Sequence, residues 1–221
     1  MSARKRPQGL SISAVMMLVM GIVVMAMWYR NKSFANLPYA SHMEDTALTI
    51  DGEEYQLKDL AFYLASQESK VQKQARAYDL KQPQKYWNAH TNGSFVRVEA
   101  RDALIEHAVH DEIFYKMAKS EGLELTKEET AYMENQKMDF WNDLEEEGQR
   151  RLGVSFEEIG ETFYHMALAQ KKQQMLAEDK GFEFEMYNAN GSEYKKILKD
   201  HTYETNEKLW KRLNFGNITV N

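Results

Sequence analysis

One helix ends and another begins within the stretch AKSEGLELTKEE, residues 118–129. Gly122 is the residue type that most often follows the last turn of a helix, because glycine adopts the left-handed conformation without strain. Thr126 and Glu129 have the spacing of a capping box, in which the threonine hydroxyl and the glutamate carboxylate each accept a backbone N–H. The stretch therefore predicts a helix over about 95–120 and a further helix from 126 to about 147.

The same pattern recurs in LGVSFEEI, residues 152–159. Gly153 again provides a stop, and Ser155 with Glu158 forms a second capping box. This predicts a helix from 155 to about 177. Two boxes that each follow a glycine make these helix boundaries the firmest structural predictions from the sequence.

Toward the N-terminus, residues 46–57 read TALTIDGEEYQL, with apolar residues alternating on both sides of Asp51-Gly52. An Asp-Gly pair between alternating segments is the strongest short signal for a β-hairpin. Apolar residues at spacings of three and four then predict a helix over about 57–78. Pro83 and Asn92-Gly93 break the helical pattern in residues 81–94.

The C-terminal part predicts a fifth helix over about 191–212, followed by an alternating, β-branched segment at 214–220. This segment is a candidate third strand beside the hairpin, since a hairpin alone is marginally stable. The fold class that we expect for residues 46–221 is therefore mostly α, with five helices and a small β-hairpin joined by a C-terminal strand.

Gly9–Tyr29 contains 21 residues without a charge, which is the length that a helix needs to cross a bilayer. Three basic residues precede it, which favours a cytoplasmic N-terminus. We expect a cytoplasmic tail at 1–8, a transmembrane signal anchor at 9–29 and a linker at 30–45, with the main domain outside a bacterial cell membrane. A cleaved signal peptide and a buried core helix are the alternatives.

The charge distribution argues against nucleic-acid binding. Five of the 28 basic residues lie within residues 1–32, which contain no acidic residue, so the remainder has 23 basic and 34 acidic residues and a net charge of −11. Phosphate binding needs a basic face instead. The absence of cysteine excludes disulfides, a thiol nucleophile and cysteine-based zinc sites.

Motifs for catalysis or for cofactor binding are absent from the sequence. It contains no Gly-x-Ser-x-Gly, no P-loop, no dinucleotide fingerprint and no His-Glu-x-x-His. Glu106, His107, His110 and Asp111 cluster on one expected helix, but no histidine follows a glutamate by three residues, as helical di-iron sites require. We expect no metal, no cofactor and no catalytic residue.

The expected helices at 126–147 and 155–177 carry more aromatic and methionine residues than one core stripe requires. The second of them has two apolar stripes, through Phe163 and through Tyr164, about 100° apart. Both stripes could pack inside the protein, or one could line a groove for apolar peptide, a role that suits the adaptable methionine side chain. The candidate peptide-binding residues are Tyr132, Met138, Phe140, Trp141, Tyr164, Leu168 and Met175.

The hairpin before a helix, the stretch at 118–129 and the stretch at 152–159 together resemble the N-terminal chaperone domain of the SurA and PrsA family of extracytoplasmic foldases, which is related to the peptide-binding arms of trigger factor. The likeness covers roughly residues 46–178. The sequence departs from the family in two places: Gln56 and Leu57 stand where the family often has a threonine cap, and the loop at 81–94 is longer than the family's.

The resemblance implies that the domain binds unfolded exported polypeptides in an apolar helical cradle, without ATP. Many members also carry a parvulin prolyl-isomerase domain after the fourth helix. Only 43 residues follow Glu178, fewer than such a domain needs, so we expect no isomerase activity. The two rivals are a scaffold for one dedicated partner and an isomerase-related enzyme. The sequence predicts no oligomeric state.

Overall fold

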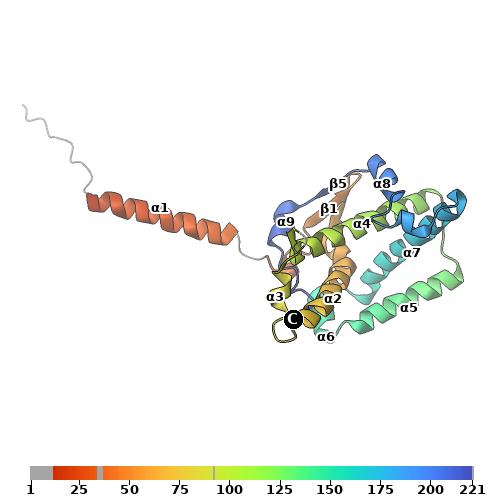
Figure 1. Cartoon of the computed structure of the whole chain (residues 1–221), viewed down its shortest axis with the longest axis horizontal. Helices are drawn as coiled ribbons and strands as arrows, with labels where there is room; N and C mark the ends of the chain where they lie inside the picture. Colours follow the sequence, from red (N-terminus) through yellow and green to blue (C-terminus); the bar gives the residue numbers. More distant parts are fainter. Residues whose placement is uncertain (1–11, 34–36, 92, 221) are drawn as a thin grey trace, which may run out of the picture. The chain divides into compact units, whose positions relative to one another are not determined.

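The computed structural model describes residues 12–33, 37–91 and 93–220, and the chain divides into two units, 1–36 and 37–221 (Figure 1). The first unit contains helix α1 (Ile12–Ser33). Residues 1–11, which include the expected tail and the start of the expected anchor, lie outside the described residues. In the described part of the chain, no helix has both the length and the apolar character that a membrane crossing requires. The second unit begins at Leu37, within the expected linker.

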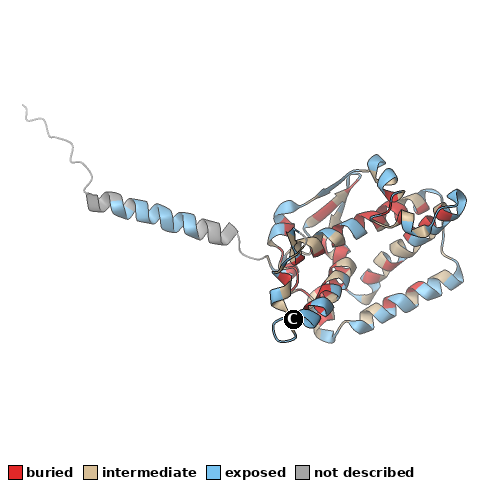
Figure 2. Ribbon diagram, viewed as in Figure 1, coloured by how far each residue is buried: buried red, intermediate tan, exposed pale blue. Residues whose placement is uncertain are grey.

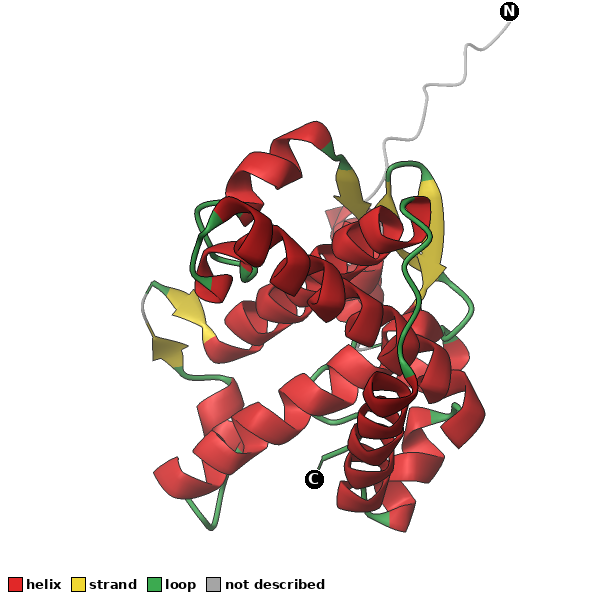
Figure 3. Ribbon diagram, turned by 90° about the vertical axis from the view of Figure 1, so that its right-hand side faces the viewer, coloured by secondary structure: helices red, strands yellow, loops and turns green. Residues whose placement is uncertain are grey.

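The second unit is mostly helical and contains two small antiparallel sheets, which confirms the expected fold class in outline (Figure 3). Its α-helices are α2 (Ala61–Tyr78), α3 (Gln84–Trp87), α4 (Val96–Ser120), α5 (Lys127–Asp143), α6 (Glu146–Leu152), α7 (Phe156–Lys180), α8 (Tyr194–Ile197) and α9 (Glu207–Arg212). Its 3-10 helices are η1 (Tyr39–Ser41), η2 (Leu57–Leu60), η3 (Phe184–Tyr187) and η4 (Leu198–Asp200). Its strands are β1 (Thr46–Ile50), β2 (Glu53–Gln56), β3 (His90–Thr91), β4 (Ser94–Phe95) and β5 (Tyr203–Thr205).

Both capping boxes form as predicted. The Thr126 hydroxyl accepts the Glu129 amide at 3.2 Å, while the Glu129 carboxylate accepts the Thr126 amide at 2.7 Å. At the start of α7, Ser155 and Glu158 make the same pair of bonds at 3.1 and 2.7 Å. Each box satisfies backbone N–H groups that would otherwise lack a partner in the first turn.

The predicted hairpin also forms, and it supplies two strands of a sheet with the order β2-β1-β5. Asp51 and Gly52 both have positive φ, at 52° and 83°, as a tight two-residue hairpin turn requires. Leu48 and Ile50 of β1 are fully buried on the inner face of the hairpin. The sheet therefore has one face against the helices.

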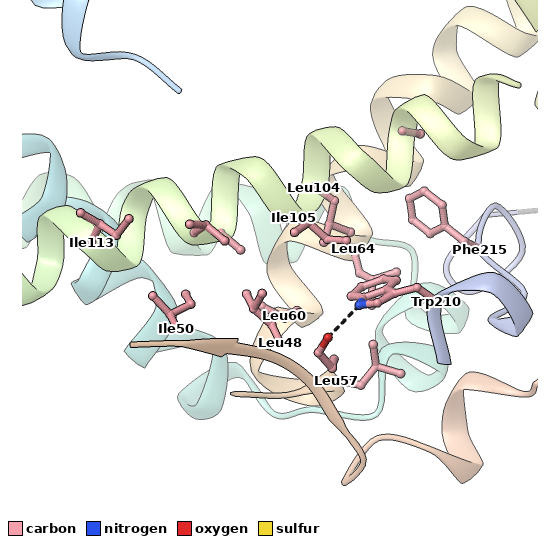
Figure 4. Packing of buried hydrophobic residues seen from close by; sticks show 14 of the residues in the cluster. Leu48, Ile50, Leu57, Leu60, Leu64, Leu104, Ile105, Ile113, Trp210 and Phe215 are labelled. Atoms are coloured by element: carbon pink, nitrogen blue, oxygen red, sulfur yellow. Dashed lines mark hydrogen bonds between the residues drawn. The ribbon is translucent and has the colours of Figure 1, made fainter. Parts of the chain in front are cut away.

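The main core lies between the sheet, α2, α4 and the C-terminal elements. Figure 4 shows Leu104, Ile105 and Ile113 of α4 above Leu48 and Ile50 of the hairpin. At one end of this core the indole N–H of Trp210 donates to the carbonyl of Ala47 at 2.8 Å, which ties α9 to β1. The long helices α4 and α7 pack against each other along much of their length.

The prediction of one helix from 126 to about 147 is wrong at its C-terminal end. α5 ends at Asp143, and a separate short helix, α6, starts at Glu146. The Gln149 side chain donates to the carbonyls of Trp141 and Leu144 at 2.8 and 3.0 Å, so it satisfies groups that a continuing helix would use itself. Neither a glycine nor a proline marks this break in the sequence.

The single helix expected over 191–212 is also wrong. The segment contains α8, η4, β5 and α9 in turn, and β5 pairs with β1 through Ile50 and Tyr203. Asn206 caps α9 by accepting the Leu209 amide at 3.1 Å, a start signal within the supposed helix.

Residues 203–205 therefore form the third strand of the sheet. We expected this strand at 214–220, and that prediction is wrong. Residues 214–220 instead lie against α2. There the carboxylate of Glu68 accepts the backbone amides of Gly216, Ile218 and Thr219 at 2.5–3.0 Å. Gly216 has a φ of 93°, which an extended strand does not accommodate. The C-terminal segment is thus held by a buried carboxylate.

Candidate functional site

A pocket of about 420 Å³ opens where the hairpin meets α2, α4 and α7. Its residues come from six elements, which are β1, β2, η2, α2, α4 and the first half of α7, and from the loop before α7. The residues that line it are Leu48, Ile50, Glu53, Glu54, Tyr55, Lys58, Asp59, Leu60, Tyr63, Ala108, Glu112, Val154, Glu158, Ile159, Glu161, Thr162 and His165. It is the candidate functional site.

The register of the hairpin places four side chains on the pocket face. Leu48 lies opposite Tyr55, and Ile50 lies opposite Glu53. Because directly opposed residues of an antiparallel pair point to the same side of the sheet, all four face the helices. The hairpin thus supplies two buried aliphatic side chains and, next to them, a phenol and a carboxylate.

The helices supply a polar cluster at the base of the pocket. Glu112 of α4 is only 9% exposed, and its carboxylate lies 3.2 Å from Nδ1 of His165 on α7. The His165 ring stacks on Tyr115, with 3.5 Å between the ring centroids. From α2, the hydroxyl of Tyr63 donates to Asp111 at 3.0 Å. These contacts join the three helices below the hairpin.

The hydroxyl of Tyr55 is buried and has no hydrogen-bond partner among the described residues. Burial, and then the nearby carboxylate of Glu112, raise the pKa of this hydroxyl well above its usual value. Glu112 and Glu53 are therefore close to the phenol, but neither accepts a hydrogen bond of normal geometry from it. A buried polar group without a partner is uncommon in folded proteins and needs an explanation.

The candidate metal ligands in α4 do not form a metal site. In the described part of the chain, no group of three or more histidine and carboxylate side chains is placed to hold a metal ion. His110 is buried, with Nδ1 2.8 Å from Asp111 and Nε2 2.8 Å from the carbonyl of Tyr187. Glu106 and His107 are exposed. His110 and Asp111 thus connect α4 to α2 and to η3.

The structure divides the predicted peptide-binding residues between exposed and packed positions. Tyr132 and Met138 on α5, and Tyr164 and Met175 on α7, are exposed. Leu168 is 2% exposed and belongs to the main core, where α7 meets α4. Phe140 and Trp141 pack against a second cluster of buried residues, which contains Met133, Ile159 and Phe163 among others.

The two apolar stripes of α7 therefore have two internal contacts. The stripe with Ile159 and Phe163 belongs to the second cluster, under α5 and α6, and Leu168 on the other stripe belongs to the main core. Tyr164 and Met175 remain exposed at the border of that stripe. None of the seven predicted residues lines the pocket. Their role in peptide binding stays a prediction.

Sequence reasoning did not identify the pocket, because its residues are spread over residues 48–165 and share no motif. One signal was present. The Asp-Gly hairpin, the helix after it and the capping box of α7 predicted three of the elements that surround the pocket. What the sequence did not provide was their packing around α4.

Helix α5 is held less firmly than the other long helices. Of its 17 residues only Met133 and Lys137 are buried, and its main packing partner is α7. Figure 2 shows most of α5 as exposed or intermediate, whereas the helices around the main core carry more buried positions. The ring of Phe62 on α2 contacts the ring of Phe140 on α5, with 4.9 Å between the ring centroids.

No protein-family model, no curated protein and no solved structure matches this chain.

Proposed function

We propose that the protein binds unfolded exported polypeptides outside the bacterial cell membrane, as a chaperone-like protein that uses no cofactor, no ATP and no catalytic step. The observation that carries this proposal is the open pocket, which is lined by the half-buried rings of Tyr55 and Tyr63 and backed by buried aliphatic residues of the core. Ligand sites are typically concave and largely apolar, with a few polar groups. An extended chain with apolar side chains fits that description.

The loosely packed helix α5 supports the proposal. Tyr132 is 61% exposed and Met138 is 51% exposed, so this helix presents large apolar side chains to solvent. A helix with few buried residues changes its position at low cost in free energy. Binding many unrelated unfolded chains requires such an adaptable surface.

We also propose that the segment Gly9–Tyr29 anchors the protein in the membrane with its N-terminus in the cytoplasm. The 21 uncharged residues support this, and nine large apolar side chains between Met16 and Met27 are exposed on α1. Apolar residues on all sides of a helix favour an apolar environment around it. Extraction from membranes followed by mass measurement tests the anchor, and a mature protein that starts near residue 40 would contradict it.

Binding of unfolded chains can be measured directly. The full-length chain is placed in lipid nanodiscs and titrated against two unrelated, fluorescently labelled proteins that reduction and alkylation keep unfolded. The proposal expects both to bind and their native forms not to bind, with empty nanodiscs as the control. Binding of neither unfolded protein would overturn it. Saturable one-to-one binding of only one would support a dedicated scaffold instead.

A further inference from the structure

The pocket combines the half-buried rings of Tyr55 and Tyr63 with an excess of negative charge. Six carboxylate residues line it, against one lysine and one histidine. They are Glu53, Glu54, Asp59, Glu112, Glu158 and Glu161. The two rings and the acidic rim therefore lie within one concave surface.

The basic side chains at the pocket already have partners. Lys58 forms an ion pair with Glu44 at 2.8 Å, and Lys116 forms one with Glu53 at 3.1 Å. Within the described residues, no lysine or arginine forms an ion pair with Glu54, Asp59 or Glu161. The negative charge of the rim is thus only partly compensated by the protein itself.

The carboxylates of the rim also repel one another. Partial burial raises the pKa of the Asp59 carboxyl. The amide of Gln56 and the charge of Lys58 oppose this effect, while Glu44 and Glu161 add smaller repulsion in the same direction as burial. A cation that enters the pocket would reduce this repulsion. The buried hydroxyl of Tyr55 would at the same time gain a possible donor from the ligand.

We propose that the pocket binds lysine or arginine side chains that occur within otherwise apolar segments of an unfolded polypeptide. This inference rests on the proposed function and names the class of segment that is bound. Lysine and arginine have long aliphatic stems and a cationic end, so the stem packs on the half-buried rings of Tyr55 and Tyr63 while the end meets the carboxylates of the rim. A purely apolar segment would leave the carboxylates without partners, and an acidic segment would be repelled.

Three matched peptides test the preference. They share one apolar, uncharged sequence of equal length and differ only at two positions, which carry lysine, glutamine or glutamate. Each is labelled with a fluorophore and titrated against the full-length chain in nanodiscs. We expect the lysine peptide to bind about tenfold tighter than the glutamine peptide, the size of effect that one or two partly exposed ion pairs provide. Raising the salt concentration should reduce this difference.

Two double variants locate the preference. Glu53→Gln with Glu161→Gln neutralises two exposed carboxylates of the rim and leaves the buried Glu112 in place. Glu178→Gln with Asp179→Asn removes the same charge at the far end of α7, outside the pocket. The inference expects the first variant to lose most of the preference for lysine and the second to keep it. Denaturation curves check that both variants remain folded.

The outcomes separate the inference from the proposed function. Equal binding of all three peptides would overturn the preference for cations and leave polypeptide binding intact. A preference that survives in the Glu53/Glu161 variant would overturn the assignment to this pocket. If no peptide binds, and neither unfolded protein binds in the titration above, the proposed function fails and the inference fails with it.

Discussion

The backbone amide and the hydroxyl of Thr219 both donate to one carboxylate oxygen of Glu68, at 2.6 and 2.8 Å. Glu68 lies in the middle of α2 and is completely buried. Its other oxygen accepts the amides of Gly216 and Ile218. A single side chain therefore satisfies three backbone N–H groups in a segment that has no sheet partner, and it fixes the C-terminus of the chain against α2.

Replacing Glu68 with glutamine should destabilise the protein by about 1–3 kcal/mol at neutral pH, because the new NH2 group would face donors of Thr219. Burial raises the pKa of Glu68 above its ordinary value, although the four hydrogen bonds oppose this. The folded state therefore binds the proton more tightly than the unfolded state. The contribution of Glu68 to stability should be largest below its unfolded pKa and should fall as the pH rises through the folded pKa.

Urea denaturation of the wild type and of Glu68→Gln at several pH values between about 4 and 8 checks this dependence. The stability advantage of the wild type should become smaller as the pH rises. An advantage that grows with pH would mean that the hydrogen bonds outweigh burial, and that the folded pKa is lowered.

Gly216→Ala should destabilise the protein by about 2 kcal/mol or more. Gly216 has a φ of 93°, and a Cβ built on it would lie 2.8 Å from two ring carbons of Trp87, which is itself fully buried. Both backbone strain and steric conflict therefore act. Gly181→Ala is the control, because Gly181 has a φ of 64° but open space around it. Equal losses of stability in thermal denaturation would contradict the packing argument.

Two tyrosine-to-phenylalanine substitutions should have different effects on stability. The Tyr39 hydroxyl donates to the carbonyl of Leu152 at 3.1 Å in a buried position, so Tyr39→Phe should cost about 1 kcal/mol. The Tyr55 hydroxyl is buried without a partner, so Tyr55→Phe should cost nothing or raise the free energy of unfolding. Chemical denaturation of both variants measures the difference. A clear loss in Tyr55→Phe would show that its hydroxyl has a partner in solution.

Backbone amides in α5 should exchange with solvent faster than those in α4. Two residues of α5 are buried, whereas α4 contributes twelve buried residues and packs against α2 and α7. Local opening of α5 therefore needs less free energy than global unfolding. Hydrogen exchange followed by mass spectrometry checks this. Equal protection of the two helices would contradict the view of α5 as an adaptable element, and Thr126→Ala should increase exchange in α5 alone through loss of its cap.

The sequence predicted those parts of the fold that depend on local chemistry. The two capping boxes and the Asp51-Gly52 turn were correct, because hydrogen bonds within a few residues determine them. The break after Asp143 was missed, because the contact that accompanies it joins the Gln149 side chain to the carbonyls of Trp141 and Leu144. Such a contact has no signature in composition or periodicity.

The C-terminal part was predicted poorly because long-range contacts decide its structure. The segment 214–220 has an alternating pattern, but its amides bond to Glu68, a residue about 150 positions away in the chain. Asn206 was a visible cap signal that the apolar periodicity of 191–212 concealed. The pocket depends in the same way on packing between β1, α4 and α7, which no local pattern encodes.

The central claim is that unfolded polypeptide binds in the pocket beneath the hairpin. The most direct test places a photo-crosslinking side chain at Glu161, on the rim, and in a second variant at Glu178, near the end of the same helix. Both variants of the full-length chain are illuminated with a labelled unfolded protein, and crosslinked product is measured. The account predicts strong crosslinking from position 161 and little from position 178. Equal crosslinking from both positions, or none from 161, would contradict it.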